Sequence, residues 1–267
     1  MIAAGPTAGV PSMTDRAAEV EALRSAYQAV LKRIAGACQR AGRDPGDVRL
    51  VAVSKTVAVG RLQAAVEAGI TMLGENRVQE AEGKIASVAG AQWHLVGPLQ
   101  KNKARRALET FDVIQTVDSV ALAERLDRLA REVRSAGPAA RYPVLLQVNV
   151  DDDPSKAGLV PDDLPAALEA VAPLDALDVR GLMTIGRLVS DAEAARPTFR
   201  TLRGLSDRLR GGGALLGPEL SMGMTDDFEV AIEEGATIVR VGRAIFGERP
   251  HRDGPDEPEH SHAVADR

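Results

Sequence analysis

Short apolar runs alternate with amphipathic segments along most of this chain. The runs are rich in β-branched and aliphatic residues and occupy residues 50–55, 71–76, 92–97, 113–118, 143–150, 179–186, 219–224 and 237–242. Apolar strands flanked by helices are typical of a parallel sheet that is buried on both faces. The pattern therefore predicts an α/β fold built from eight successive strand–helix units.

Two helical segments show the pattern most clearly. In the first, apolar side chains recur at helical spacing at Leu23, Tyr27, Val30, Leu31, Ile34 and Cys38. We expect Thr14 to cap this helix and Gly42 to end it. The second carries Leu122, Leu126, Leu129 and Val133, with Ser119 before them and Gly137 after them. Apolar residues at this spacing between a cap and a glycine predict a helix in both places.

The number of units favours a closed barrel. Eight strand–helix units within residues 14–247 match the size of a (β/α)8 barrel, about 250 residues. A doubly wound open sheet is the alternative, but no G-x-G-x-x-G follows the first strand and no G-x-x-x-x-G-K-[ST] occurs. We predict a single (β/α)8 TIM-type barrel with an extra N-terminal helix.

Both ends of the sequence differ from the barrel in composition. Residues 1–13 are rich in Gly, Pro, Ala and Thr, and residues 248–267 are polar with three prolines. We expect both segments to be disordered. Three of the four histidines, His251, His260 and His262, lie in the polar tail, where a solvated segment is favoured over a metal site.

Composition narrows the choice of partners and location. The 267 residues carry a formal net charge of −5, and aromatic residues make up 3%, which argues against nucleic acid as a partner. No apolar run is long enough to cross a membrane, and the first thirteen residues lack a signal-peptide pattern. The single cysteine, Cys38, excludes an internal disulfide and a cysteine-rich metal site. We expect a cytoplasmic protein.

Polar residues stand where the predicted strands end. Reactive residues of such barrels gather at the carboxyl ends of the strands. The corresponding positions here are Lys55, Glu75, Asn76, His94, Asp118, Asn149, Ser221 and Arg240. The sequence therefore predicts a polar rim around the mouth of the barrel.

Lys55 is the sharpest candidate on this rim. It ends the first strand, and only six of the 33 basic residues are lysines. Apolar surroundings would lower the pKa of its amine and make it available to attack a carbonyl carbon. The alternative is a salt bridge from Lys55 to Glu75 or Asp118. Lys84, by contrast, is expected on a polar helix face.

The last two strands suggest a phosphate site. Barrels of this kind frequently bind phosphate with the loops after strands seven and eight, here at Ser221 and Gly242. Gly242 permits a close backbone approach, and the amides of residues 242–244 would point toward an anion. Arg243 either adds charge or projects outward, and Ser221 taken alone would be a turn or cap residue.

Arg240 and His94 have two interpretations each. Arg240 shares its strand face with Gly242 and should point inward, where it needs an acceptor. It either forms an ion pair with Glu219, Asp118 or Glu75, or donates to a ring nitrogen of a bound cofactor. His94 either lines a ligand or is a core histidine with satisfied hydrogen bonds.

Six motifs together resemble one known family. They are AVSKT (52–56), GENRVQE (74–80), WHLVGPLQKNK (93–103), SKAGL (155–159), GLMTIG (181–186) and LSMGMTDDFEVAIEEGATIVRVGRAIFG (220–247). In this order they are similar to the pyridoxal-phosphate homeostasis protein family, whose members resemble a free-standing N-terminal barrel of bacterial alanine racemase. The resemblance covers residues 14–247.

The resemblance implies a barrel that binds pyridoxal 5′-phosphate (PLP) as a Schiff base on Lys55. Ser221 and the backbone at Gly242 and Arg243 would hold the phosphate, and Arg240 would face the pyridine nitrogen. Asn76 and His94 complete the expected cofactor-binding residues. Family members often have Thr where this chain has Arg243, so a hydroxyl contact to phosphate would be lost there.

The resemblance also implies a role in vitamin B6 and amino-acid homeostasis rather than catalysis. An arginine does not readily protonate the pyridine nitrogen, which weakens the ring as an electron sink. Racemisation would need a second acid–base group, and Tyr27 and Tyr142 are both expected far from the mouth. We expect no second domain, a monomer, and PLP-dependent apoenzymes as acceptors.

Three alternatives remain at this point. The first is a PLP-dependent amino-acid racemase. The second is a Schiff-base aldolase that acts on a phosphorylated sugar without PLP, because a lysine beside a phosphate site suits both. The third is a helix-mediated interaction scaffold, which leaves the polar rim unexplained.

Overall fold

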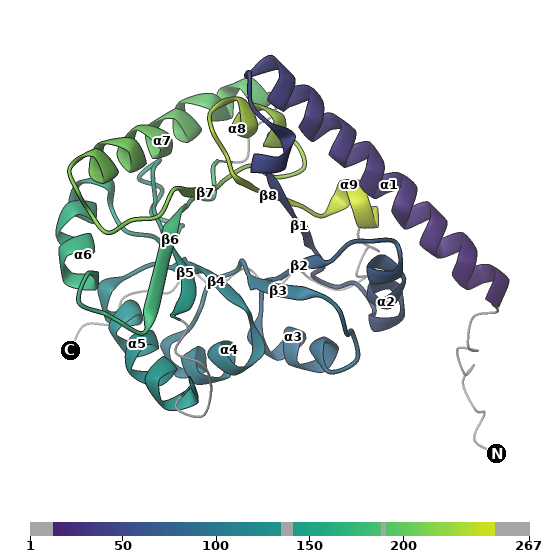
Figure 1. Cartoon of the computed structure of the whole chain (residues 1–267), viewed down its shortest axis with the longest axis horizontal. Helices are drawn as coiled ribbons and strands as arrows, with labels where there is room; N and C mark the ends of the chain where they lie inside the picture. Colours follow the sequence, from purple (N-terminus) through teal and green to yellow (C-terminus); the bar gives the residue numbers. More distant parts are fainter. Residues whose placement is uncertain (1–12, 135–140, 188–190, 249–267) are drawn as a thin grey trace.

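The computed structural model describes residues 13–134, 141–187 and 191–248 of the chain (Figure 1). The disorder expected for residues 1–13 and 248–267, and the helix end expected at Gly137, fall almost entirely outside these ranges. Met13 is described, and it is the first residue of a helix rather than part of a disordered extension.

Eight parallel strands of the described residues close into a barrel in sequence order, with β8 paired to β1 (Figure 1). The bounds of the strands are β1 (Arg49–Val53), β2 (Met72–Glu75), β3 (Gln92–Leu95), β4 (Val113–Val117), β5 (Tyr142–Gln147), β6 (Leu177–Met183), β7 (Glu219–Ser221) and β8 (Ile238–Val241). Each predicted apolar run overlaps one strand, although β1, β5 and β6 begin one or two residues before their runs, and the predicted barrel is confirmed. The seventh strand ends at Ser221, three residues earlier than the run.

Helices surround the barrel and follow the strands in the expected alternation (Figure 1). The α-helices are α1 (Met13–Arg40), α2 (Val59–Glu67), α3 (Val78–Ile85), α4 (Ala104–Thr110), α5 (Val120–Arg134), α6 (Leu164–Val171), α7 (Arg196–Gly211), α8 (Phe228–Glu233) and α9 (Arg243–Phe246). Short 3-10 turns occupy Pro45–Asp47, Lys101–Lys103, Pro161–Asp163 and Ala192–Ala195.

The strands bury both of their faces because successive side chains point in opposite directions. One large apolar cluster lies between the strands and the helices, and includes Ala52, Trp93 and Leu95. A small cluster of Val51, Val96, Leu145, Met183 and Ile238 lies apart from it and fills the inside of the barrel. This double burial explains why the strands are continuous apolar runs.

The long helix α1 lies outside the barrel and packs against α2, α8 and α9 (Figure 1). Its predicted apolar stripe is confirmed, since Leu23, Val30, Ile34 and Cys38 are buried. The predicted cap at Thr14 is wrong, because the helix already includes Met13 and Thr14 lies within its first turn. Gly42 ends the segment with a φ of 65°, a conformation that glycine adopts without strain.

The second predicted helix is confirmed as α5, where Ser119 Oγ accepts a hydrogen bond from the Leu122 amide at 3.3 Å. At the amino end of the barrel, Arg49 pairs with Glu219 at 2.7 Å, and the Tyr142 hydroxyl donates to the Phe111 carbonyl. Tyr142 is therefore far from the mouth, as expected. None of the described helices is long and apolar enough to span a bilayer.

Candidate functional site

Lys55 follows β1 at the mouth of the barrel. Val51 and Val53 belong to the apolar packing inside the barrel, whereas Ala52 belongs to the outer cluster. The Ser54 side chain points outward as well, because its hydroxyl donates to Glu75 Oε1 at 2.6 Å. The strand itself ends at Val53, and Lys55, which is half-buried, lies in the turn that follows it at the mouth of the barrel.

A chain of hydrogen bonds crosses the inside of the barrel. Arg240 Nη1 donates to Ser221 Oγ at 2.7 Å, and Ser221 Oγ donates to Gln115 Oε1 at 2.6 Å. Gln115 Nε2 then lies 2.8 Å from His94 Nδ1. Because β4 and β7 are not neighbours in the sheet, the bond between Gln115 and Ser221 passes through the interior. We call these four residues the inner network.

The donors and acceptors of the inner network fix the tautomer of His94. Arg240 can only donate, so the Ser221 proton goes to the Gln115 carbonyl oxygen, and the Gln115 amide group faces His94. His94 Nδ1 therefore accepts, and the ring proton lies on Nε2. Burial, assisted by the charges of Arg49 and Arg180, lowers the pKa of His94 to about 4 and keeps the ring neutral.

His94 is thus a buried histidine, with 2% of its surface exposed, and its Nε2 has no hydrogen-bond partner among the described residues. The ring is therefore buried, as a core histidine would be, but only one of its two nitrogens is satisfied. Whether a ligand contacts it stays a prediction.

Arg240 points into the barrel, as predicted, and bonds two neutral oxygens there. Besides Ser221 Oγ, it donates from Nη2 to the Thr184 carbonyl at 2.7 Å. Burial lowers the pKa of its guanidinium to about 10, which the charge of Asp227 partly opposes. The guanidinium remains a cation at neutral pH, held by dipoles with a single carboxylate nearby.

The carboxylates that were expected as alternative partners of Arg240 are engaged elsewhere. Glu219 pairs with Arg49 at the opposite end of the barrel. Asp118 accepts a hydrogen bond from Ser119 Oγ at 3.1 Å, and burial raises the pKa of its carboxyl. Glu75 pairs with Lys84. Arg240 therefore forms none of the three predicted ion pairs.

The turn at Gly242 lies against the end of β1. A Cβ on Gly242 would come within 3.1 Å of the Val53 carbonyl oxygen, so a larger residue would crowd the first strand. Because β8 pairs with β1, this turn and Lys55 are neighbours on the rim. The first amides of α9, at Arg243 and Ala244, have no partner within the helix and face its amino end.

Arg243 itself projects outward. Its side chain is 47% exposed and pairs with Asp226, and it also approaches Glu248 at 3.9 Å. Of the two orientations considered from the sequence, the structure shows the outward one. Any contribution of Arg243 to an anion site comes from its backbone amide.

The sequence interpretation missed Thr225. The Arg240 amide donates to the Gly223 carbonyl at 3.0 Å, and Asp226 pairs with Arg243, so the loop after β7 runs beside the Gly242 turn. Thr225 lies in this loop and is half-buried. The sequence predicts a strand through residue 224, and Ser221 is the only residue of that run with a hydroxyl group.

Asn76 stands at the end of β2, where it meets Gly97 after β3. A Cβ on Gly97 would lie 2.4 Å from the Asn76 carbonyl oxygen, so only glycine permits this approach. Asn76 is half-buried at the rim. The structure thus places Lys55, Asn76 and Gly242 at one end of the barrel, with Ser221, Arg240 and His94 deeper inside.

The prediction that Lys84 occupies a polar helix face is wrong. Lys84 is 8% exposed, and its amine bonds Glu75 Oε1 and Glu80 Oε1, both at 2.8 Å, and the Ser54 carbonyl at 3.0 Å. Helical periodicity in a sequence cannot distinguish a lysine that faces solvent from a buried lysine that pairs with two carboxylates. Glu75, one of the two carboxylates considered for a salt bridge with Lys55, pairs with Lys84, and a bridge from Lys55 to Glu75 or Asp118 stays a prediction.

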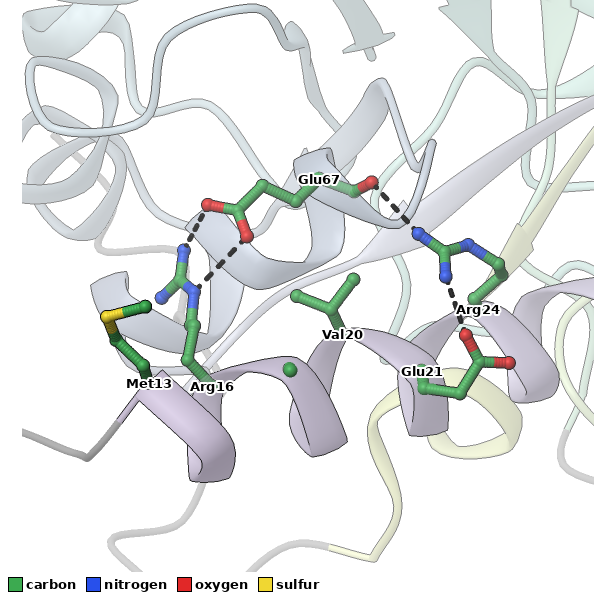
Figure 2. A pocket seen from close by; sticks show the side chains of 7 residues that line it. Met13, Arg16, Val20, Glu21, Arg24 and Glu67 are labelled. Carbon is green, nitrogen blue, oxygen red and sulfur yellow. Dashed lines mark hydrogen bonds and ion pairs between the residues drawn. The ribbon is translucent and has the colours of Figure 1, made fainter.

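A separate hollow lies outside the barrel, between α1 and the end of α2 (Figure 2). Arg16 bonds the Glu67 carboxylate at 2.7 Å, and Arg24 bonds Glu21 at 2.6 Å. Its charged groups therefore satisfy each other, as Figure 2 shows. The residues that line this hollow include no lysine, serine, threonine, cysteine or histidine.

The rim and the inner network combine an amine, a buried guanidinium, backbone amides and a hydroxyl. An amine at the mouth can attack a carbonyl carbon, and amides beside a hydroxyl suit an anion. A buried arginine that bonds neutral oxygens can donate to a further acceptor. The arrangement fits a small anionic carbonyl compound.

The chain matches the family described as alanine racemase, N-terminal domain, over residues 26–250. It is 45% identical to the pyridoxal phosphate homeostasis protein of Pseudomonas aeruginosa over 225 residues, which cover 83% of this chain and 94% of that protein. The protein of the same name from Aquifex aeolicus is 39% identical, with 83% and 96% covered.

Solved structures agree with this assignment. PipY of Synechococcus elongatus, solved with PLP bound, is 41% identical, covers 82% of this chain and 100% of its own, and superposes with a TM-score of 0.70. An alanine racemase of Clostridium difficile, at 15% identity and a TM-score of 0.59, shares the barrel fold. The chain belongs to the pyridoxal phosphate homeostasis protein family, whose barrel is that of the alanine racemase N-terminal domain.

Proposed function

We propose that this protein holds PLP as a Schiff base on Lys55 and acts in vitamin B6 and amino-acid homeostasis rather than in catalysis. The observation that carries the proposal is the pairing of β8 with β1, which brings the Gly242 turn beside the end of β1, two residues before Lys55. The PLP-bound structure of the related PipY supports it.

The residues at the mouth fit the chemistry of this cofactor. When bound, PLP supplies an aldehyde carbon, an aromatic nitrogen and a phosphate. Lys55 would supply the amine that condenses with the aldehyde, whose oxygen would leave as water, and the Arg240 guanidinium would donate a hydrogen bond to the ring nitrogen. The amides of Gly242 and Arg243 would bind the phosphate, with Thr225 beside them. Asn76 and His94 border the ring from β2 and β3.

In this proposal, the chief role of Ser221 is to position the Arg240 guanidinium. Its single proton is donated to Gln115, and it accepts a hydrogen bond from Arg240 Nη1. A serine so engaged orients the guanidinium toward the ligand. The direct phosphate contact predicted for Ser221 would require its proton to leave Gln115, whereas the Thr225 hydroxyl stands in the adjacent loop.

A carrier role follows from the acid–base groups near the mouth. Because Arg240 keeps its proton, it does not protonate the ring nitrogen, and the ring is a weak electron sink. Racemisation also needs a second acid–base group across the substrate. Tyr142 bonds the Phe111 carbonyl at the other end of the barrel, and Tyr27 lies on α1 outside it.

Borohydride reduction of the native protein, followed by peptide mapping, tests the proposal. We expect a phosphopyridoxyl group on Lys55, and we expect Lys55→Ala to lose the visible absorption. Lys103→Ala, at a lysine in the 3-10 turn before α4, is the control and should keep the band. Reduction that marks another lysine, or none, would refute the assignment.

Two further measurements separate the alternatives. Turnover of L-alanine to D-alanine above the rate of free PLP would favour the racemase. Trapping of a phosphorylated sugar on Lys55 without PLP would favour the aldolase. We also propose a monomer that passes PLP to apoenzymes, which size-exclusion chromatography and reactivation of a PLP-dependent apoenzyme test directly.

A further inference from the structure

A closed ring of polar groups lies behind Lys55, on the outer side of the first two strands. Its members come from the end of β1, the end of β2 and the helix α3: Ser54, Thr56, Glu75, Glu80 and Lys84. We call this set the outer ring. The two residues that flank Lys55 in sequence both belong to it, although Lys55 itself does not.

The bonds of the outer ring run from one flank of Lys55 to the other. On one side, the Ser54 hydroxyl donates to Glu75 Oε1 at 2.6 Å, and the Ser54 carbonyl accepts from Lys84 Nζ at 3.0 Å. On the other side, the Thr56 amide donates to Glu80 Oε1 at 2.6 Å. Lys84 Nζ joins Glu75 and Glu80, each at 2.8 Å. One buried cation thus connects both flanks.

The backbone at Thr56 needs such support. Its φ is 67°, in the left-handed region, which is unfavourable for a β-branched side chain. This conformation turns the chain sharply after Ser54 and keeps Lys55 at the barrel mouth. The bond from the Thr56 amide to Glu80 opposes relaxation of the turn.

The outer ring is separated from the ligand side by the strands themselves. Ser54 and Glu75 lie on the faces that alternate with the inward ones, and Glu75 is completely buried. Ser54 and Glu75 therefore lie behind the strands, away from a molecule at the mouth.

We propose that Glu80 and Lys84 are positioning residues that hold the Lys55 amine toward the barrel mouth by fixing the left-handed turn at Thr56. This inference rests on the proposed function for its ligand, since the amine is the group that PLP would occupy. The geometry of the turn itself is independent of that ligand.

Helix α3 supplies a matched pair of variants. Glu80 and Glu82 are two residues apart, and each side chain is 27% exposed and engaged in an ion pair. Glu80 pairs with Lys84 and bonds the Thr56 amide, whereas Glu82 pairs with Arg106 and does not belong to the outer ring. Glu80→Ala removes the tie to Thr56 but leaves Lys84 paired with Glu75, so the buried cation keeps a partner.

The first readout is the dissociation constant of PLP, measured with the pH midpoint of the visible band. We expect Glu80→Ala to weaken PLP binding by about tenfold and to shift the midpoint, because relaxing a strained turn releases free energy of that order. Glu80→Gln keeps an acceptor for the Thr56 amide and should recover most of the affinity. Glu82→Ala should stay within about twofold of the wild type.

The second readout uses the protein without PLP, so that it decides the inference even if the proposed function fails. Pulse labelling with acetic anhydride, quantified by mass spectrometry, reports the reactivity of each lysine. We expect the labelling rate of Lys55 to change at least about threefold in Glu80→Ala. The labelling rates of the other lysines, apart from Lys84, should stay the same, because only the surroundings of Lys55 and Lys84 are altered. Hydrogen exchange over residues 54–57 should accelerate in the same variant.

The outcomes are distinct. Equal PLP affinity and equal Lys55 labelling in Glu80→Ala and Glu82→Ala would overturn the positioning role. A wild type that binds no PLP, but whose Lys55 labelling depends on Glu80 and not on Glu82, would refute the proposed function and retain the positioning role.

Discussion

The inner network and the outer ring stand on opposite sides of the strand wall and use polar groups differently. The inner network places one cation, Arg240, among neutral partners, and ends at a neutral histidine. The outer ring places one cation, Lys84, between two carboxylates. The inner network is buried, whereas the outer ring reaches the surface at Thr56 and Glu80. Both connect elements that are separate in sequence.

The difference concerns which charge is left for a ligand. In the outer ring, the charge of Lys84 is paired with Glu75 and Glu80. Burial raises the pKa of the Glu75 carboxyl despite the hydrogen bonds from Lys84 and Ser54. In the inner network, dipoles orient Arg240 while most of its charge is uncompensated. The ion pairs of the outer ring hold the backbone in place, whereas the dipoles of the inner network orient Arg240 and leave its charge available to a ligand.

Removing the cation of the outer ring should give the largest effect. Lys84→Met leaves two carboxylates without their partner, and we expect the free energy of unfolding to fall by about 3–5 kcal/mol. Adding Glu75→Gln should restore part of this loss. Urea denaturation measures both, and Lys32→Met on the exposed side of α1 should stay within about 0.5 kcal/mol of the wild type. A change for Lys84→Met as small as that control would contradict the buried pairing.

The neutral end of the inner network predicts a pH dependence of stability. The pKa of His94 is lowered to about 4 from an ordinary value of 6.5, so between these values the unfolded chain binds more protons. The free energy of unfolding should therefore fall by about 3 kcal/mol as the pH drops through this window. His94→Gln cannot take up the proton and keeps an acceptor for Gln115.

The variant should accordingly lose less stability than the wild type between pH 7 and pH 4, measured by urea denaturation at each pH. Parallel curves for the two proteins would show that His94 is not the neutral buried group of the inner network.

Cutting the middle of the inner network should have a smaller effect. Ser221→Ala leaves Gln115 Oε1 and Arg240 Nη1 short of one bond each, which should lower the free energy of unfolding by about 1–2 kcal/mol. Thr225→Ala, in the half-buried loop, should change stability less but weaken PLP binding. Thermal denaturation and PLP titration of the two variants distinguish them, and unchanged PLP binding in Thr225→Ala would contradict a phosphate contact from its hydroxyl.

The smallest effect should come from replacing Arg243, which belongs to neither the inner network nor the outer ring. Its exposed pairing with Asp226 is a surface ion pair, so Arg243→Ala should change the free energy of unfolding by less than about 1 kcal/mol. PLP affinity should be retained, because the backbone amide remains. Loss of PLP binding in this variant would show that the guanidinium turns inward when the ligand is present.

The alternation of apolar runs was sufficient to predict the barrel, its eight strands and the helix α5, because buried parallel strands and amphipathic helices differ in period. The same alternation placed Arg240 on the inward face. It misjudged Thr14, because the helix already includes Met13 and Thr14 lies within its first turn. It also hid Thr225, because β7 ends at Ser221 and Gly223 then takes a φ of 90°, whereas the apolar run continues to residue 224.

What the sequence by itself determined is therefore which face of each strand a residue occupies and which chemical groups reach the rim. The tertiary structure alone decided their partners. Ser221 and Gln115 are 106 positions apart and meet only because the closed barrel sets β4 opposite β7. Lys84 reaches Ser54 across 30 positions because α3 packs behind the first two strands. Hydrogen bonds and ion pairs act over a few ångströms, and only the folded chain brings such groups within that range.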